Sequence, residues 1–259
     1  MLGLGNSITS GSYSSWSPED VDNLTLWLSA NTNILADQDN GNNTISHSSN
    51  AGDMQDDDQI NRWNANGSTS INAIQTTQAD KPRWETDAND LGAVNFKAGL
   101  KFMDLDTQIN CTGVCSFVFR LKPTDLSAVR AIVGSTNTEF FQFQSNAQIR
   151  IKVDNNQVNF TELSETFITT KYHIITLVRN SSDQWTAYVK VLGAGSTEKT
   201  WGDANQTQAG TFTVTNLGCK ANDSANFNGF MKDVLVYNGT ALSSAERADM
   251  YDYLINQEY

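Results

Sequence analysis

The chain has 259 residues, a length at which an all-β sandwich commonly forms a single domain. Hydrophobic residues make up 39% of it and include 6 Trp and 12 Phe, so it can bury a core without help from a disulfide or a metal. Its net charge of −12 repels polyanions, which argues against a nucleic-acid partner.

The three cysteines are odd in number and form no C-x-x-C pair, which argues against a disulfide framework or a zinc site. We expect Cys111, Cys115 and Cys219 to be buried free thiols, with a bridge from Cys219 to either of the others as the alternative. The sequence shows no signal peptide and no apolar run of ~18 residues, so we expect no membrane partner.

Residues 1–16 are rich in Gly and Ser and predict an N-terminal arm, and residues 17–259 predict one folded domain. The domain begins with signals for a single helical turn. Ser17 is a favourable N-cap, and Pro18 suits the first helical position.

Two different sequence patterns follow this turn. Apolar residues alternate along Leu24–Leu28, which predicts a half-buried strand. The span 31–92 is polar and has little periodicity. We interpret it as a long functional loop or a partly ordered surface that Trp63 and Trp84 anchor.

From Gly92 onward, short alternating segments follow one another closely, and turn clusters such as Asp154–Gln157 and Asn180–Asp183 separate several of them. These segments carry the pairs or triplets Val94/Phe96, Leu100/Phe102, Phe117/Phe119/Leu121, Phe141/Phe143, Ile149/Ile151/Val153, Val158/Phe160, Tyr172/Ile174, Trp185/Ala187/Val189, Phe212/Val214 and Val234/Val236. Many short strands without helical patterns between them predict an all-β protein of two antiparallel sheets.

The C-terminus is the exception to this pattern. Ser243 and Glu246 have the spacing of a capping box. A short amphipathic helix is therefore expected, with one face formed by Ala248, Tyr251, Leu254 and Ile255.

Three stretches resemble the concanavalin A-like lectin/glucanase (laminin G-like) modules of phage structural proteins. They are Leu24–Ala30, the pair Tyr172–Asn180 and Trp185–Lys190, and the block from Phe227 through Leu242–Arg247 to Leu254. The resemblance implies a jelly-roll β-sandwich over about residues 17–259. Met1–Ser7 is also similar to the starts of tailed-phage structural proteins, which implies a place on the virion.

Two glycine-containing motifs are similar to enzyme motifs but lack essential parts. Gly5–Thr9 resembles the nucleophile block of lipase-like hydrolases, yet neither His47 nor His173 stands in the Asp-x-x-His setting of that family. Gly193–Thr200 resembles a phosphate-binding loop, but Glu198 would repel phosphates. We expect an arm and a loop between strands, respectively.

Acidic segments suggest two further kinds of site. Glycosidases need paired carboxylates, and the nearest spacing, Glu85–Asp90, falls in a polar loop. Asp37–Gly41 and Asp53–Asp58 offer oxygen ligands to calcium but do not fit the twelve-residue calcium loop. We therefore expect no enzymatic activity, no cofactor and no metal.

Trp201, Asp203 and Asn205 form the candidate glycan-binding site. An aromatic face can stack on a sugar ring while carboxylate and amide groups bond its hydroxyls. The alternative is that Trp201 covers the edge of the sandwich.

These observations predict a non-enzymatic accessory protein of a virion that displays a lectin-like sandwich and binds glycans weakly. Its partners would be capsid or tail proteins, bound through the arm of residues 1–16, and glycans of the host surface. A carbohydrate-active enzyme such as a polysaccharide depolymerase and a free-standing lectin are the alternatives. Capsid or tail attachment, the sugar and a homo-oligomeric state are left open.

Overall fold

The computed structural model describes residues 16–30, 32–37, 56–86, 92–97, 101–162, 165–193, 195–220 and 224–256, without the side chains of 203–205. Nearly all of the predicted arm lies outside these residues, so the boundary at residue 16 stays a prediction. Trp16 is described and packs edge-on against Tyr253, with 5.9 Å between ring centroids. The described helices include none long and apolar enough to cross a membrane.

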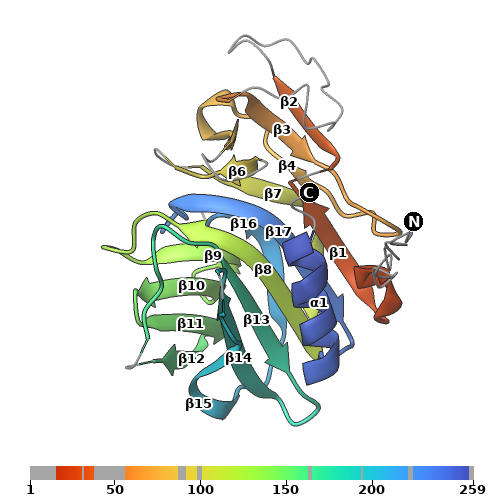
Figure 1. Cartoon of the computed structure of the whole chain (residues 1–259), viewed down its shortest axis with the longest axis vertical. Coiled ribbons are helices and arrows are strands. Elements are labelled where there is room, and N and C mark those ends of the chain that lie inside the picture. The colour runs from red at the N-terminus through yellow and green to blue at the C-terminus, as the bar shows by residue number, and fades with distance from the viewer. Residues whose placement is uncertain are drawn as a thin grey trace, which may run out of the picture.

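In the described part of the chain, seventeen strands pair into one antiparallel network that folds into two layers (Figure 1). The back sheet has the order β1 (Leu24–Ser29), β17 (Gly229–Asn238), β8 (Cys115–Pro123), β13 (His173–Arg179), β14 (Gln184–Val191), β15 (Lys199–Thr207). The front sheet has the order β4 (Ala73–Ile74), β7 (Met103–Cys111), β16 (Phe212–Leu217), β9 (Arg130–Thr136), β10 (Glu139–Ser145), β11 (Gln148–Val153), β12 (Asn156–Thr161). The remaining strands are β2 (Ile34–Asp37), β3 (Gln59–Trp63), β5 (Arg83–Glu85) and β6 (Ala93–Asn95). β3 pairs with β4, β2 and β5, and β6 pairs with β5 and β17, so these strands bridge the two sheets.

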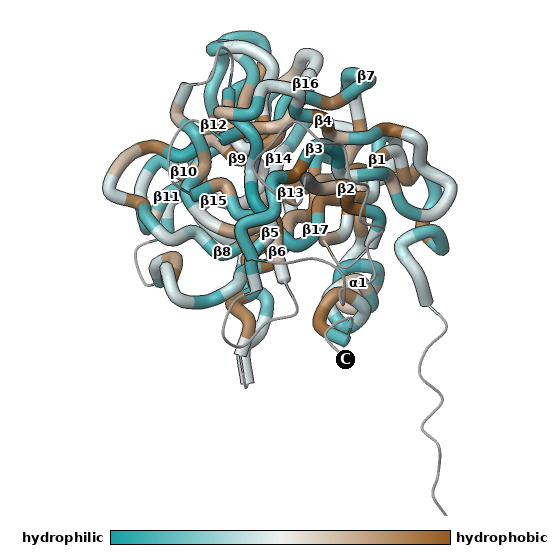
Figure 2. The backbone as a smooth tube through the Cα atoms, turned by 90° about the horizontal axis from the view of Figure 1, so that it is seen from above, coloured by the Kyte–Doolittle hydropathy of each residue, from teal (hydrophilic) through white to brown (hydrophobic). Residues whose placement is uncertain are grey.

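The main core lies between the two sheets. Side chains alternate along each strand, so every second residue points inward, as in β11, where Ile149, Ile151 and Val153 are buried. Figure 2 shows apolar and polar segments throughout the described chain. Phe119 of β8 meets Phe141 of β10 with 5.6 Å between ring centroids, and Phe117 meets Phe212 of β16 at 5.3 Å. The predicted all-β sandwich of two antiparallel sheets is confirmed.

A second, smaller core forms where helix α1 (Ser244–Asn256) covers the outer face of the back sheet (Figure 1). The predicted capping box is present: the Ser243 backbone N–H donates to Glu246 Oε2 at 2.7 Å, and the Glu246 N–H donates to Ser243 Oγ at 3.3 Å. Tyr251 and Leu254 are buried as predicted.

One residue of the predicted helix face is wrong. Ala248 is exposed, and Arg247 and Met250 are buried in its place. The buried face of the helix includes Arg247 because its guanidinium donates hydrogen bonds to Glu198 and to the Leu242 carbonyl oxygen. A pattern of apolar residues does not predict a buried arginine.

The long polar span 31–92 contains more regular structure than predicted. It holds β2 to β5 and a short 3-10 turn, η2 (Gln78–Asp80). These strands have two to five residues, too few for an alternation to be visible in sequence. The two predicted anchors are confirmed, since Trp63 is fully buried and Trp84 is 2% exposed.

Several local predictions are confirmed. Ser17 caps the turn η1 (Pro18–Asp20) by accepting from the Glu19 N–H at 3.3 Å. Asp154 and Asn155 join β11 to β12 with positive φ angles of 45° and 67°, as a tight hairpin requires. The three cysteines are buried free thiols.

Candidate functional site

Trp201, the aromatic residue of the candidate glycan-binding site, lies in the edge strand β15. Its indole points between the sheets, is 2% exposed and packs on Phe167, with 4.2 Å between ring centroids. The face that could have stacked on a sugar is therefore covered by protein, as the alternative interpretation predicts. Asp203 and Asn205 lie in the same strand, but their side chains are outside the described part of the chain. Their contact with a glycan stays a prediction.

Gly202 explains how β15 reaches this position. Its φ is +68°, and a Cβ there would lie 2.8 Å from the Cα of Phe160 in β12. Glycine thus lets the last strand of the back sheet pass directly over the last strand of the front sheet. An isolated glycine within an alternating segment signals such a close approach, and this signal could have identified residues 199–207 as a strand.

Glu198 of the β14–β15 loop faces helix α1. It is the acidic residue that sets 193–200 apart from a phosphate-binding loop. It accepts hydrogen bonds from Arg247 Nε and Nη2 at 2.8 and 2.9 Å and from the Tyr251 hydroxyl. Burial raises the pKa of Glu198, but the bonds from Arg247 and Tyr251 outweigh burial and hold the pKa below its usual value. The carboxylate therefore ties the β14–β15 loop to the helix.

The other side of this loop borders a cavity of about 520 Å³. Val189, Val191 and Ile168 supply apolar lining, and Ile168 is 38% exposed. Glu165 and Lys199 face each other at 3.8 Å and line the same cavity. The lining mixes these apolar side chains with polar ones such as Thr166, Ser196 and Thr197, and the space is large enough to hold a small polar molecule.

His173, weighed above as a catalytic base, supports the wall of this cavity from inside. It is fully buried, and its Nε2 accepts the backbone N–H of Ile168 at 3.2 Å. Burial is the main cause that lowers the pKa of His173 to about 4. The imidazole is therefore neutral at pH 7 and holds the 165–171 segment in place.

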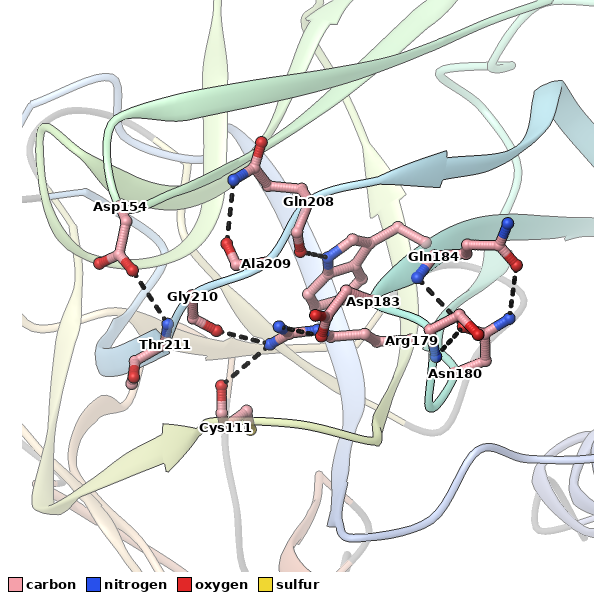
Figure 3. Close-up of polar contacts among 12 residues, drawn as sticks. Cys111, Asp154, Arg179, Asn180, Asp183, Gln184, Gln208, Ala209, Gly210 and Thr211 are labelled. Carbon is pink, nitrogen blue, oxygen red and sulfur yellow. Dashed lines mark hydrogen bonds and ion pairs between the residues drawn. The ribbon is translucent and has the colours of Figure 1, made fainter.

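The opposite end of β13 and β14 is closed by polar contacts (Figure 3). Arg179 is 1% exposed and donates from Nη1 to the carbonyl oxygens of Gly210 and Cys111 at 2.7 and 3.3 Å. Its Nη2 bonds Asp183 Oδ1 at 2.5 Å, and its guanidinium lies 5.6 Å from the centre of the Trp185 ring. These contacts hold together the end of the sandwich that lies opposite the cavity.

The acidic segments have structural partners where they are described. Asp56 accepts the N–H of Thr86 at 2.5 Å, a bond that lowers the pKa of Asp56, and Asp57 pairs with Arg83 at 2.7 Å. Glu85 ends β5, whereas 87–90 and 38–55 lie outside the described residues. Within the described ranges, His, Cys, Asp and Glu form no group of three that could hold a metal ion.

The fold was compared with those of solved structures. A mutant of a GH54 α-L-arabinofuranosidase soaked with 4-nitrophenyl α-L-arabinofuranoside has a TM-score of 0.64 at 12% identity, covering 91% of this chain and 63% of that chain. The chain therefore spans less than two thirds of that protein. Domain 4 of a GH43 extracellular arabinanase from Geobacillus stearothermophilus, in complex with arabinotriose, has a TM-score of 0.49 at 13% identity. The match covers 88% of this chain and 97% of that chain.

At these identities the structural similarity concerns the fold. No curated protein sequence is similar enough to count as a relative. The family model described as the concanavalin A-like lectin/glucanases superfamily matches residues 97–246, more than half of the chain. The chain therefore belongs to the concanavalin A-like lectin/glucanases superfamily.

Proposed function

We propose that this protein is a non-catalytic carbohydrate-binding module that takes a sugar in the cavity between the 165–171 segment and the β14–β15 loop. The observation that carries the proposal is this 520 Å³ space at the open end of a lectin-type sandwich. Val189, Val191 and Ile168 offer apolar contact to the C–H faces of a sugar ring. Hydroxyls on the ring would bond Glu165 and Lys199.

The charge pattern of the cavity favours binding over hydrolysis. Its described lining contains one carboxylate, Glu165. Glycosidases that work with two carboxylates place them roughly 5 to 9.5 Å apart on either side of the bond that they cleave. Glu165 instead lies 3.8 Å from the ammonium of Lys199, and the two side chains offer an acceptor and a donor to the hydroxyls of a ligand.

Affinity gel electrophoresis tests the proposal. The purified protein is run through gels that contain arabinan, arabinoxylan, β-glucan or mannan, and retardation by at least one of them is expected. Val191→Trp, which fills the cavity, should abolish the retardation. Val153→Ile changes an apolar residue of β11 remote from the cavity and should preserve it. Equal retardation of Val191→Trp and the unchanged protein in every gel, or no retardation in any gel, contradicts the proposal.

The same samples separate a binding module from the alternative, a depolymerase. New reducing ends released from any of these polysaccharides, and lost in Glu85→Gln, would replace binding by catalysis as the function. We expect no release because the described lining of the proposed sugar site contains a single carboxylate, Glu165.

The proposal includes display on a tailed-phage particle, with residues 1–16 as the arm that attaches the module to capsid or tail proteins. The resemblance of Met1–Ser7 to the starts of phage structural proteins supports this part. Mass spectrometry of purified particles should find the protein, in hundreds of copies for a capsid position or a few for a tail position. Deletion of residues 1–16 should prevent its incorporation, and normal incorporation would refute the role of the arm.

A further inference from the structure

A group of three cations lies on the outer face of the front sheet, away from the cavity. In the register of β10 with β11, Phe140 is opposite Lys152 and Gln142 is opposite Arg150. Phe141 and Phe143 point into the core, so Phe140, Gln142 and their partners point outward. These strands lie side by side in Figure 1.

The third cation comes from a distant part of the chain. Lys220 follows β16, and its backbone crosses over Gly134 of β9, where a Cβ would lie 3.0 Å from the Lys220 Cα. Gly134 is itself opposite Phe140. The ammonium of Lys220 therefore lies 4.8 Å, and that of Lys152 5.9 Å, from the centre of the Phe140 ring. We call Arg150, Lys152 and Lys220 the cation cluster.

The positive charge of the cluster is not neutralised by the described residues. None of the ion pairs in the described part of the chain includes a cluster residue. Burial, together with repulsion from Lys152 and Arg150, lowers the pKa of Lys220. The like charges of the cluster repel one another, and a bound anion would relieve this repulsion.

A buried acceptor beside the cluster also lacks a partner. Gln142 is 2% exposed, and its Nε2 donates to Gln144 at 2.7 Å, but its Oε1 has no hydrogen-bond partner among the described residues. A buried carbonyl oxygen that is left unpaired destabilises the folded protein. A ligand hydroxyl would satisfy it. Next to it, Arg150 donates from Nε to Asn159 at 2.7 Å, which leaves its other N–H groups to a ligand.

From these contacts we infer that the cation cluster binds a carboxylate or sulfate group of an acidic oligosaccharide, whose hydroxyl bonds Gln142. Arg150 would bond the anionic group through its planar fork, and the two ammoniums above Phe140 would neutralise it. The lysines occupy the ring face, so Phe140 is not a stacking platform. A nucleic acid, with one charge per ~1.7 Å in a duplex, meets stronger repulsion from the remaining surface. That the ligand is a sugar rests on the proposed function; the anion site itself does not.

Isothermal titration with matched ligands tests the inference at low ionic strength. Trigalacturonate carries carboxylates, its methyl ester has the same skeleton without charge, and a sulfated trisaccharide supplies the other anion. We expect trigalacturonate or the sulfated sugar to bind at least about tenfold more tightly than the ester. Whichever anion binds more tightly identifies the group that the cluster prefers.

The variants separate this site from the cavity. Lys220→Met should weaken binding of the preferred anion about tenfold, and Arg150→Gln with Lys152→Met and Lys220→Met about a hundredfold. Methionine keeps the apolar stem over Phe140. Three cations removed elsewhere, Arg83→Gln with Lys97→Met and Lys190→Met, give the same net charge and should change the affinity less than threefold.

The possible results lead to different conclusions. Equal affinity for charged and methyl-ester ligands, or equal losses in the cluster and control variants, overturns the anion site. Val191→Trp should abolish binding of neutral polysaccharide without affecting the anion preference. If Val191→Trp has no effect while the cluster variants do, the proposed cavity fails and the anion site stands.

Discussion

Replacing Glu198 with Gln tests how the wall of the cavity is held. Glu198 accepts two hydrogen bonds from Arg247, at 2.8 and 2.9 Å, and a third from Tyr251. The side chains of Arg247 and Glu198 are 7% and 25% exposed. Glutamine keeps the shape and one acceptor oxygen but removes the negative charge, so the guanidinium is left facing a neutral amide.

The expected loss follows from this partial burial. An exposed ion pair contributes about 0 to 1 kcal/mol, whereas breaking a buried pair costs about 3 to 5 kcal/mol. Arg247 would keep its bond to the Leu242 carbonyl oxygen at 2.9 Å and its place 3.6 Å from the Tyr188 ring centre. We therefore expect Glu198→Gln to lower the free energy of unfolding by about 2 kcal/mol. That is a large share of the roughly 5 to 15 kcal/mol that stabilises a domain.

Urea unfolding followed by tryptophan fluorescence measures this loss, and the thermal midpoint should fall by about 4 to 8 °C. The difference should also depend on pH. Because the pKa of folded Glu198 is lowered from 4.5, its contribution is complete at pH 7 and is lost as the pH falls through the folded pKa. The variant and the unchanged protein should thus converge in stability in acid.

Glu246→Gln is the matched control, because Gln serves a capping box as well as Glu does. It should change stability by less than about 0.5 kcal/mol. A loss below about 0.5 kcal/mol for Glu198→Gln, or a loss of 2 kcal/mol that is the same at pH 3.5 and pH 7, refutes the idea that a charged pair anchors the loop.

Three further changes test other parts of the structure. Gly202→Ala should cost about 2 kcal/mol or more in urea unfolding, because its Cβ meets the Phe160 backbone at φ +68°, whereas Gly113→Ala has open space and should be nearly neutral. As the pH falls from 6.5 to 4, the unchanged protein should lose up to about 3 kcal/mol of stability, because only the unfolded chain protonates His173 in this range. His173→Gln should remove this loss. Equal pH profiles for the two proteins would exclude this role of His173. Lys220→Met, free of ligand at pH 7, relieves repulsion and should raise the free energy of unfolding by less than about 1 kcal/mol, which raises the thermal midpoint slightly. A lowered midpoint would contradict the cation cluster.

The sequence by itself determined the elements whose signals are local. The alternation after Gly92 identified the long strands because the pleat requires every second side chain to face the core. The capping box at Ser243 and the positive-φ turn at Asp154 depend on residues a few positions apart. The strands of 31–92 escaped prediction since two to five residues carry too little alternation.

Tertiary structure alone decided where the candidate sites lie. The sequence makes Trp201 a plausible sugar-stacking residue. In the structure β15 crosses over β12, and the Trp201 indole packs on Phe167 instead. The cation cluster unites Lys152 with Lys220, and the cavity unites two loops. These contacts depend on strand order and register, which are set by the packing of the whole core and not by neighbouring residues.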